Sequence, residues 1–258
     1  MVAAVPWPGS GRACREHIRN RRECEEGGVS VTAEPYLELP ERIVPTRAAI
    51  LVLHGGKAES QAPVEARQLT VRRMQPFARD LAALGDDLAV VQLRYRLRGW
   101  NGTGTDALAD VDHALTVVDA RFGNVPIVVV GHSMGGRAAL RTAGHPTVRG
   151  VVALAPWLPD REPVDQLARR DVVVLHGTRD LTTSPRASAR FVARAAPIAR
   201  RAVCLHVPWS GHGMIVRAST WHRLTAAFVA AIVDDAPFDR ALSIARRAGC
   251  RTDGATPT

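Results

Sequence analysis

The sequence predicts a fold of the α/β class, in which a mostly parallel β-sheet is covered by helices on both faces. Three observations support this prediction. Short apolar runs alternate along the chain with segments of helical periodicity. The apolar runs are nearly continuous, as is typical of strands that are buried on both faces. The segments between them are long enough to hold the helical crossovers that parallel strands require.

The expected elements follow one another in regular order. Residues 29–40 predict edge strands, and the other expected strands are 47–56, 87–96, 125–133, 148–156, 170–177 and 201–208. The expected helices are 74–85, 105–123, 134–144, 184–196 and 215–235. Gly85 and Gly123 suit helix ends, and Ser184 followed by Pro185 suits a helix start. Only residues 157–170 separate two of the strands, so we expect little or no cap over the sheet.

The chain divides into three parts. Its 258 residues suit one large domain. Residues 1–28 show little periodicity, and we interpret them as an N-terminal extension that is either disordered or the product of a wrongly assigned translation start. Residues 29–235 form the expected folded domain, and residues 236–258 are interpreted as a polar C-terminal tail.

Charge and composition exclude several classes of function. The net charge is +9, but the arginines are dispersed and no aromatic residues interleave with them. This pattern predicts a solvated surface and no specific nucleic-acid partner. No apolar run approaches the ~20 residues of a membrane span, and no signal-peptide pattern is present, so we expect a cytoplasmic protein. The four cysteines include no C-x-x-C pair, so no metal site is expected.

The strongest motif is GHSMGG, residues 131–136, which follows an expected strand and begins an expected helix. G-x-S-x-G in that setting predicts a sharp, strained turn that presents a serine at the carboxyl edge of the sheet. Gly131 and Gly135 suit this turn because a Cβ at either position would clash across it. The N-terminus of the following helix stabilises developing negative charge. Ser133 is therefore the candidate nucleophile.

Two more polar residues lie in loops after expected strands. Asp180 ends the segment LHGTRD, and His212 lies between glycines in SGHGM. Taken alone, such an aspartate can equally cap its own loop, and a loop histidine is most often a plain surface residue. His212 is the one histidine in this combination of position and context, whereas His54 and His132 are interpreted as structural.

The order Ser133, Asp180, His212, with each residue at the carboxyl end of a strand, resembles that of the α/β-hydrolase family. The resemblance covers about residues 30–235 and implies the family's fold and chemistry. Ser133 would attack a carbonyl carbon, and His212 would take its proton and pass it to the leaving group. Asp180 would hold the imidazole in the required tautomer and stabilise its charged form. This chemistry needs no cofactor.

The same resemblance implies an oxyanion hole made of backbone N–H groups. The first donor would be Met134, the residue after the nucleophile. The second would come from the segment His54-Gly55-Gly56, which is similar to the family's H-G-x oxyanion segment. We expect Gly56 to be this donor, with Lys57 as the next candidate; a simple turn is the alternative interpretation of HGG.

Four aromatic residues fall in or near loops on the expected active-site side: Tyr95, Trp100, Trp157 and Trp209. They are candidates for a substrate pocket that receives an acyl group. Ordinary packing of large side chains against loops explains the same pattern. The sequence does not separate these two interpretations.

The predicted function is that of a serine hydrolase acting on an ester or thioester of a small-molecule acyl substrate. An acyltransferase or a peptidase would use the same residues, and a binding protein that no longer turns over could keep the same scaffold. We expect activity to be lost in acid as His212 is protonated. The oligomeric state, the natural substrate and its acyl length do not follow from the sequence.

Overall fold

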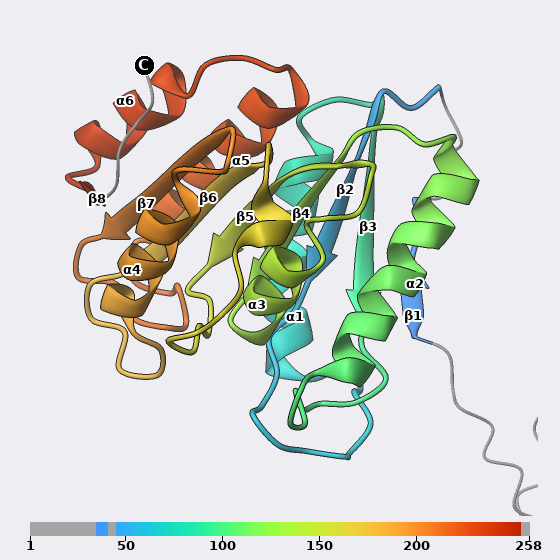
Figure 1. Ribbon diagram of the computed structural model, residues 1–258. Coiled ribbons are helices and arrows are strands. Elements are labelled where there is room, and N and C mark those ends of the chain that lie inside the picture. The colour runs from blue at the N-terminus through green and yellow to red at the C-terminus, as the bar shows by residue number, and fades with distance from the viewer. Residues whose placement is uncertain (1–34, 41–44, 254–258) are drawn as a thin grey trace, which may run out of the picture. The chain divides into compact units, whose positions relative to one another are not determined.

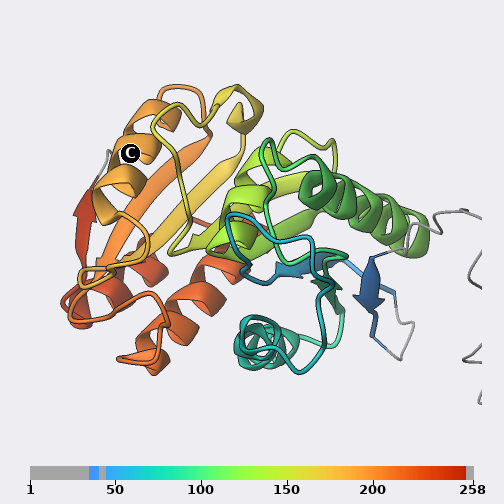
Figure 2. The ribbon, with the colours of Figure 1, turned by 90° about the horizontal axis from the view of Figure 1, so that it is seen from below.

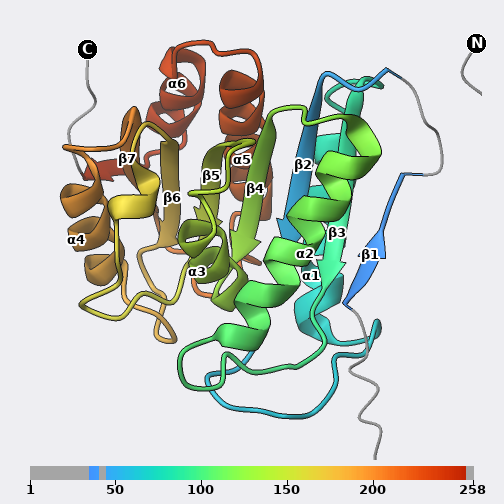
Figure 3. The same ribbon diagram turned by 45° about the vertical axis from the view of Figure 1, so that its right-hand side comes forward.

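The central feature of the computed structural model, which describes residues 35–40 and 45–253, is an eight-stranded sheet. The strand order is β1-β3-β2-β4-β5-β6-β7-β8, and Figure 3 shows the strands from β7 across to β1. β2 to β7 are parallel to one another, whereas β1 and β8 pair antiparallel with β3 and β7 at the two edges. The strands are Tyr36–Glu38, Ala48–Leu53, Leu88–Arg94, Ile127–His132, Val148–Leu154, Asp171–Gly177, Arg201–Val207 and Arg251–Asp253. The predicted mostly parallel sheet is confirmed.

Helices cover both faces of the sheet, as expected. They are α1 Leu69–Ala82, α2 Thr105–Phe122, α3 Met134–Arg141, α4 Pro185–Ala195, α5 Ala218–Val233 and α6 Asp239–Arg247. Figures 1 and 2 show α2, α3 and α4 on one face and α1, α5 and α6 on the other. Successive strand residues point to opposite faces, so Leu51 and Leu53 join one core while Ile50 and Val52 join the other. In the described part of the chain, no helix is long and apolar enough to cross a membrane.

The start of α1 differs from the sequence prediction, and the segment between β5 and β6 agrees with it. α1 begins at Leu69, several residues before the expected start. Its first turn buries no side chain, so no apolar pattern in the sequence indicates the earlier start. The segment between β5 and β6 holds only a short 3₁₀ helix, Asp165–Leu167, in agreement with the expectation of an open sheet. Buried Glu162 fixes this segment to α3 through ion pairs with Arg137 and Arg141.

The described residues after 235 are more ordered than the polar tail that the sequence indicated. They form α6, whose buried residues are only Ala241 and Ala245, and β8, which pairs with β7. Small alanines give a weak apolar signal, and the three residues of β8 are all exposed. Their position in the sheet depends on backbone pairing, which no side-chain pattern reports. The predicted extension 1–28 lies outside the described residues.

The topology creates a natural site for chemistry at one edge of the sheet. β2 lies between β3 and β4, so the chain first adds a strand on one side of β2 and then crosses to the other. The loops that follow β2 and β4 therefore diverge at the carboxyl ends of these strands, which is where open α/β sheets bind their ligands. The segments 54–57 and 131–136 lie at these two strand ends.

Candidate active site

The turn between β4 and α3 has the strained geometry that the motif predicts. Ser133 adopts φ 56° and ψ −115°, a backbone conformation that L-residues rarely occupy. A Cβ on Gly131 would lie 2.2 Å from the Gly135 carbonyl oxygen, and a Cβ on Gly135 would lie 2.5 Å from the His54 carbonyl oxygen. Both positions therefore require glycine. The strain presents the Ser133 side chain at the N-terminus of α3.

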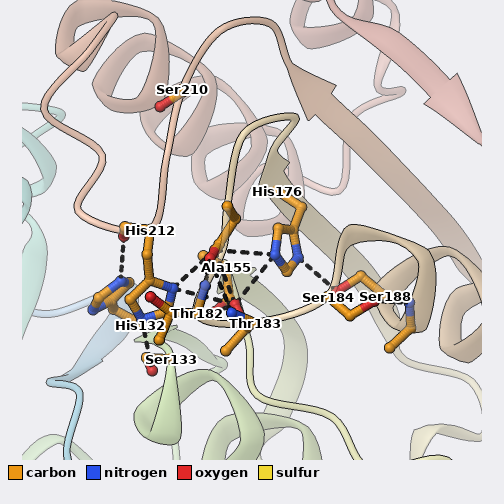
Figure 4. Close-up of polar contacts among 12 residues, drawn as sticks. His132, Ser133, Ala155, His176, Thr182, Thr183, Ser184, Ser188, Ser210 and His212 are labelled. Carbon is orange, nitrogen blue, oxygen red and sulfur yellow. Dashed lines mark hydrogen bonds and ion pairs between the residues drawn. The ribbon is translucent and has the colours of Figure 1, made fainter.

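The fold brings together the three residues that the sequence singles out. Ser133 Oγ lies 3.0 Å from His212 Nε2, and His212 Nδ1 lies 2.8 Å from Asp180 Oδ2. The three side chains come from the loops after β4, β6 and β7, and Figure 4 shows Ser133 and His212 at this junction. The hydroxyl is within hydrogen-bond reach of one ring nitrogen, and a carboxylate holds the other nitrogen.

Asp180 is surrounded by hydrogen-bond donors. Its Oδ1 accepts from the backbone N–H groups of Thr182 and Thr183, at 2.8 and 2.9 Å. Its Oδ2 accepts from His212, from His176 at 3.1 Å and from the Thr183 hydroxyl at 2.9 Å. Burial alone would raise the pKa of this carboxyl, but the hydrogen bonds from His176, His212 and the two backbone groups outweigh burial and hold the pKa of Asp180 well below its ordinary value. Asp180 is therefore a carboxylate.

His132 fixes the loop that carries His212. Its Nε2 donates to the His212 carbonyl oxygen at 3.0 Å, and the two rings lie 4.8 Å apart. Burial, followed by the nearby His212, lowers the pKa of His132 to about 3, so the ring is neutral. Arg73 of α1 adds a hydrogen bond to the Gly213 carbonyl oxygen. The structural interpretation of His132 thus gains a definite role, which is to position the histidine loop.

The two expected oxyanion donors lie next to each other. A Cβ on Gly56 would lie 2.4 Å from Met134 Sδ, which shows how closely the loop after β2 approaches the start of α3. Within the described residues, neither the Gly56 N–H nor the Met134 N–H has a hydrogen-bond acceptor. The Lys57 N–H, in contrast, donates to the Arg98 carbonyl oxygen at 2.8 Å. This contact favours Gly56 over Lys57 as the second donor.

His54 fixes the loop after β2, which carries the expected oxyanion donor Gly56. Its Nδ1 donates to the Gly55 carbonyl oxygen at 2.6 Å, and its Nε2 accepts from the Tyr95 backbone N–H at 3.2 Å. One nitrogen donates and the other accepts, which is the pattern of a neutral imidazole. Burial lowers the pKa of His54 to about 4, in agreement with this tautomer. His54 therefore ties the loop after β2 to the end of β3.

The four aromatic candidates do not form one pocket in this structure. Tyr95 and Trp100 are only 2% and 1% exposed and pack within the core. Trp100 and half-buried Trp157 lie against the Arg137 guanidinium, at 4.1 and 4.7 Å from ring centre to guanidinium carbon. Trp209 is 62% exposed and stacks on an arginine elsewhere. The packing interpretation therefore holds for Tyr95 and Trp100. Trp157 and Trp209 retain surface that a substrate could meet.

Two residues of the site are absent from the sequence prediction. His176 and Thr183 both contact the Asp180 carboxylate, together with the residues already named. The available signal was the spacing in LHGTRD, where the histidine comes four residues before Asp180.

Among the residues that the structure describes, no group of three or more potential ligands is arranged to hold a metal ion.

The strand order, the strained serine turn and the contiguous Ser–His–Asp side chains define a protein of the α/β-hydrolase fold. The sequence agrees with this class. The model of a family described as "Serine aminopeptidase, S33" matches residues 44–170, which is just under half of the chain. No curated protein sequence matches the chain. Over residues 44–170 the sequence is similar to that family, and the chain as described has the α/β-hydrolase fold.

Solved structures support the fold at low sequence identity. Thermogutta terrifontis esterase 2 superimposes with a TM-score of 0.59 at 20% identity, over 78% of this chain and 90% of that chain. Est1E from Butyrivibrio proteoclasticus gives 0.58 at 15% identity, over 78% and 94%. XC6422 from Xanthomonas campestris, described as an α/β serine hydrolase without lid, gives 0.55 at 17% identity, over 74% and 85%.

Proposed function

We propose that the protein is a serine hydrolase that cleaves a carboxylic ester or thioester through an acyl-enzyme intermediate. The observation that carries this proposal is the contact between Ser133 Oγ and His212 Nε2 on a strained turn, with the Asp180 carboxylate behind the ring. This is the arrangement that activates a serine hydroxyl. The name of one structural neighbour, Thermogutta terrifontis esterase 2, favours the ester class.

In the first half of the proposed reaction, Ser133 Oγ attacks the carbonyl carbon while His212 Nε2 takes the hydroxyl proton. The carbonyl oxygen becomes an anion, which the N–H groups of Met134 and Gly56 stabilise. His212 then donates its proton to the departing alcohol or thiol. Asp180 accepts from Nδ1 throughout, so the positive charge on the ring is compensated. The product that leaves is the alcohol or thiol, and the acyl group stays on Ser133.

In the second half, water replaces the leaving group. His212 removes a proton from the water, and the hydroxyl attacks the acyl carbon. The same N–H groups stabilise the second oxyanion. His212 returns its proton to Ser133 Oγ as the carboxylic acid leaves. An alcohol or amine in place of water would give acyl transfer, so the acceptor alone separates the hydrolase from the acyltransferase.

The test is a substrate panel with the wild-type protein, Ser133→Ala and a control variant. Ser219→Ala is a suitable control because Ser219 is exposed on α5. The panel contains p-nitrophenyl esters of graded acyl length, an acyl thioester and an aminoacyl p-nitroanilide, which covers the peptidase alternative. We expect the wild type and the control to hydrolyse an ester or thioester, and Ser133→Ala to lose at least about 10³-fold in kcat.

A covalent probe separates the mechanism from the choice of substrate. A fluorophosphonate should label the wild type at Ser133, as located by peptide mass spectrometry, and should leave Ser133→Ala unlabelled. Labelling without ester turnover would move the substrate class toward amides. Equal hydrolysis by the wild type and Ser133→Ala, with no labelling at Ser133, would contradict the proposed function.

A further inference from the structure

A second imidazole contacts the Asp180 carboxylate, and the mechanism above makes no use of it. His176 is the last residue but one of β6 and is fully buried. Its Nε2 lies 3.1 Å from Asp180 Oδ2, and its Nδ1 lies 2.8 Å from Oγ of Ser188, a fully buried residue of α4. Figure 4 shows the His212 and His176 rings on either side of Thr183.

The positions of the protons follow from the chemistry of these groups. A carboxylate only accepts hydrogen bonds, so the His176 nitrogen that faces Asp180 carries a proton. In a neutral imidazole the other nitrogen then accepts, and the Ser188 hydroxyl donates to it. His212 has the same arrangement, with Nδ1 toward Asp180 and Nε2 toward Ser133 Oγ. Asp180 thus lies between two serine–histidine pairs, His212 with Ser133 and the fully buried His176 with Ser188.

The buried pair acts through Asp180 alone, because neither of its side chains reaches solvent. We propose that His176 is a positioning residue, whose imidazole, oriented by Ser188, holds the Asp180 carboxylate where His212 can donate to it. The effect of His176 on reaction rate rests on the proposed function. Its effect on the geometry and titration of His212 does not.

The proposal predicts a change that a loss of folding would not cause. The His176 N–H shares the negative charge of Asp180 Oδ2 with His212. Without it, the carboxylate charge acts more fully on His212 and stabilises the protonated ring. The acid limb of the kcat/KM profile should therefore move to higher pH. A purely structural defect would lower the amount of active enzyme and leave the limb in place.

The titratable groups near His176 are few and can be controlled. Asp180 and His212 belong to the site itself. His206 is paired in register with His176 on the adjacent strand β7, and its Nε2 lies 2.7 Å from Asp253 Oδ2. His206 is almost fully buried but has no hydrogen bond to Asp180 among the described residues. It is therefore the matched control for substitution of a buried histidine.

The experiment compares His176→Leu, His176→Gln and Ser188→Ala with His206→Leu, each normalised to the number of sites titrated by the fluorophosphonate. We expect His176→Leu to lose about 10- to 100-fold in kcat with little change in KM, the rate equivalent of one charge-assisted hydrogen bond. The midpoint of the acid limb of its kcat/KM profile should move about half a pH unit higher. His176→Gln keeps an N–H near the Nε2 position and should recover most of the loss. His206→Leu should keep the wild-type rate and limb.

A second readout needs no substrate. The titration of the His212 ring is followed by NMR in the wild type, His176→Leu and Ser188→Ala, and its midpoint should rise in both variants. Ser188→Ala removes one hydroxyl and carries the comparison if His176→Leu does not fold. A midpoint and a limb that stay at the wild-type values would overturn the proposal. A shifted midpoint in a protein that hydrolyses nothing would overturn the proposed function and leave the positioning role standing.

Discussion

Two buried aspartates lie at opposite ends of β6 and have opposite surroundings. Asp171 begins the strand, and its carboxylate accepts from two guanidinium groups. Arg200 Nε lies 2.9 Å and Arg201 Nε 2.8 Å from its Oδ1. Asp180, just after the end of the strand, accepts from imidazole, hydroxyl and backbone N–H groups and contacts no arginine or lysine among the described residues.

The difference between the two partner sets explains what each end of the strand can do. A guanidinium is permanently charged, so the two partners of Asp171 stay cationic and cannot exchange a proton near neutral pH. An imidazole can gain and lose a proton near neutral pH, so the charge next to Asp180 can change during a reaction. The first carboxylate is suited to anchoring a strand end. The second is suited to supporting proton transfer.

The largest expected effect comes from removing the charge at Asp180. In Asp180→Asn an amide replaces the acceptor that holds His212 Nδ1, which favours the wrong imidazole tautomer. We expect kcat for the best ester to fall by about 10⁴-fold. Circular dichroism and urea titration establish that the variant is folded. A kcat within tenfold of the wild type would show that Asp180 has no part in catalysis.

The same substitution at the other end of β6 should act on stability. Among the described residues, Asp171→Asn leaves part-buried Arg201 without an anionic partner and leaves Arg200 with Asp235 alone. We expect the free energy of unfolding to fall by about 3 kcal/mol, at the low end for a broken buried ion pair, because Arg200 also reaches Asp235. Urea titration measures this loss.

The rate per folded molecule should stay at the wild-type value in Asp171→Asn. The seven residues of β6 place the two carboxylates about 20 Å apart. A catalytic loss in this variant, with stability unchanged, would reverse the roles assigned to the two ends of the strand.

The sequence predicts the contacts of Asp180 better than those of Asp171. Ser133 and His212 lie in short motifs whose glycines are required by close backbone contacts, so local pattern and chemistry coincide there. Asp171 is the first residue of an apolar strand, and nothing near it in the sequence indicates the two arginines thirty residues later. Contacts of this kind depend on strand pairing across the sheet.

His176 and the aromatic residues show a second reason for incomplete prediction. A histidine inside an apolar strand is typical of a packed residue. Only the position of His176 beside the loop of Asp180 in the folded chain shows that it contacts the carboxylate. Chain position predicts that Tyr95 and Trp100 follow the carboxyl end of β3. Whether their rings point into the core or toward a substrate depends on packing, which the sequence does not specify.

The smallest expected effect concerns pH and separates the carboxyl edge of the sheet, where His54 and Asp180 follow their strands, from the end of β6 that holds Asp171. The pKa of His54 is lowered to about 4, mainly by burial, against about 6.5 in the unfolded chain. Between these values the unfolded chain binds a proton that the folded chain does not, so stability decreases as the pH falls from 6.5 toward 4. The pKa of Asp180 is also depressed, and its contribution is lost at lower pH, below about 3.9.

Each such histidine should contribute a slope of about 1 kcal/mol per pH unit near pH 5. We therefore expect His54→Asn, which keeps a donor near the Nδ1 position, to show a shallower decline in unfolding free energy between pH 6 and pH 4.5 than the wild type. Urea titrations at four pH values measure both slopes. Asp171→Asn should show the wild-type slope in this range, because an aspartate in the unfolded chain titrates below it. An equal slope in the wild type and His54→Asn would mean that the loop after β2 tolerates a charged imidazole and that His54 makes no contribution to the pH dependence of stability.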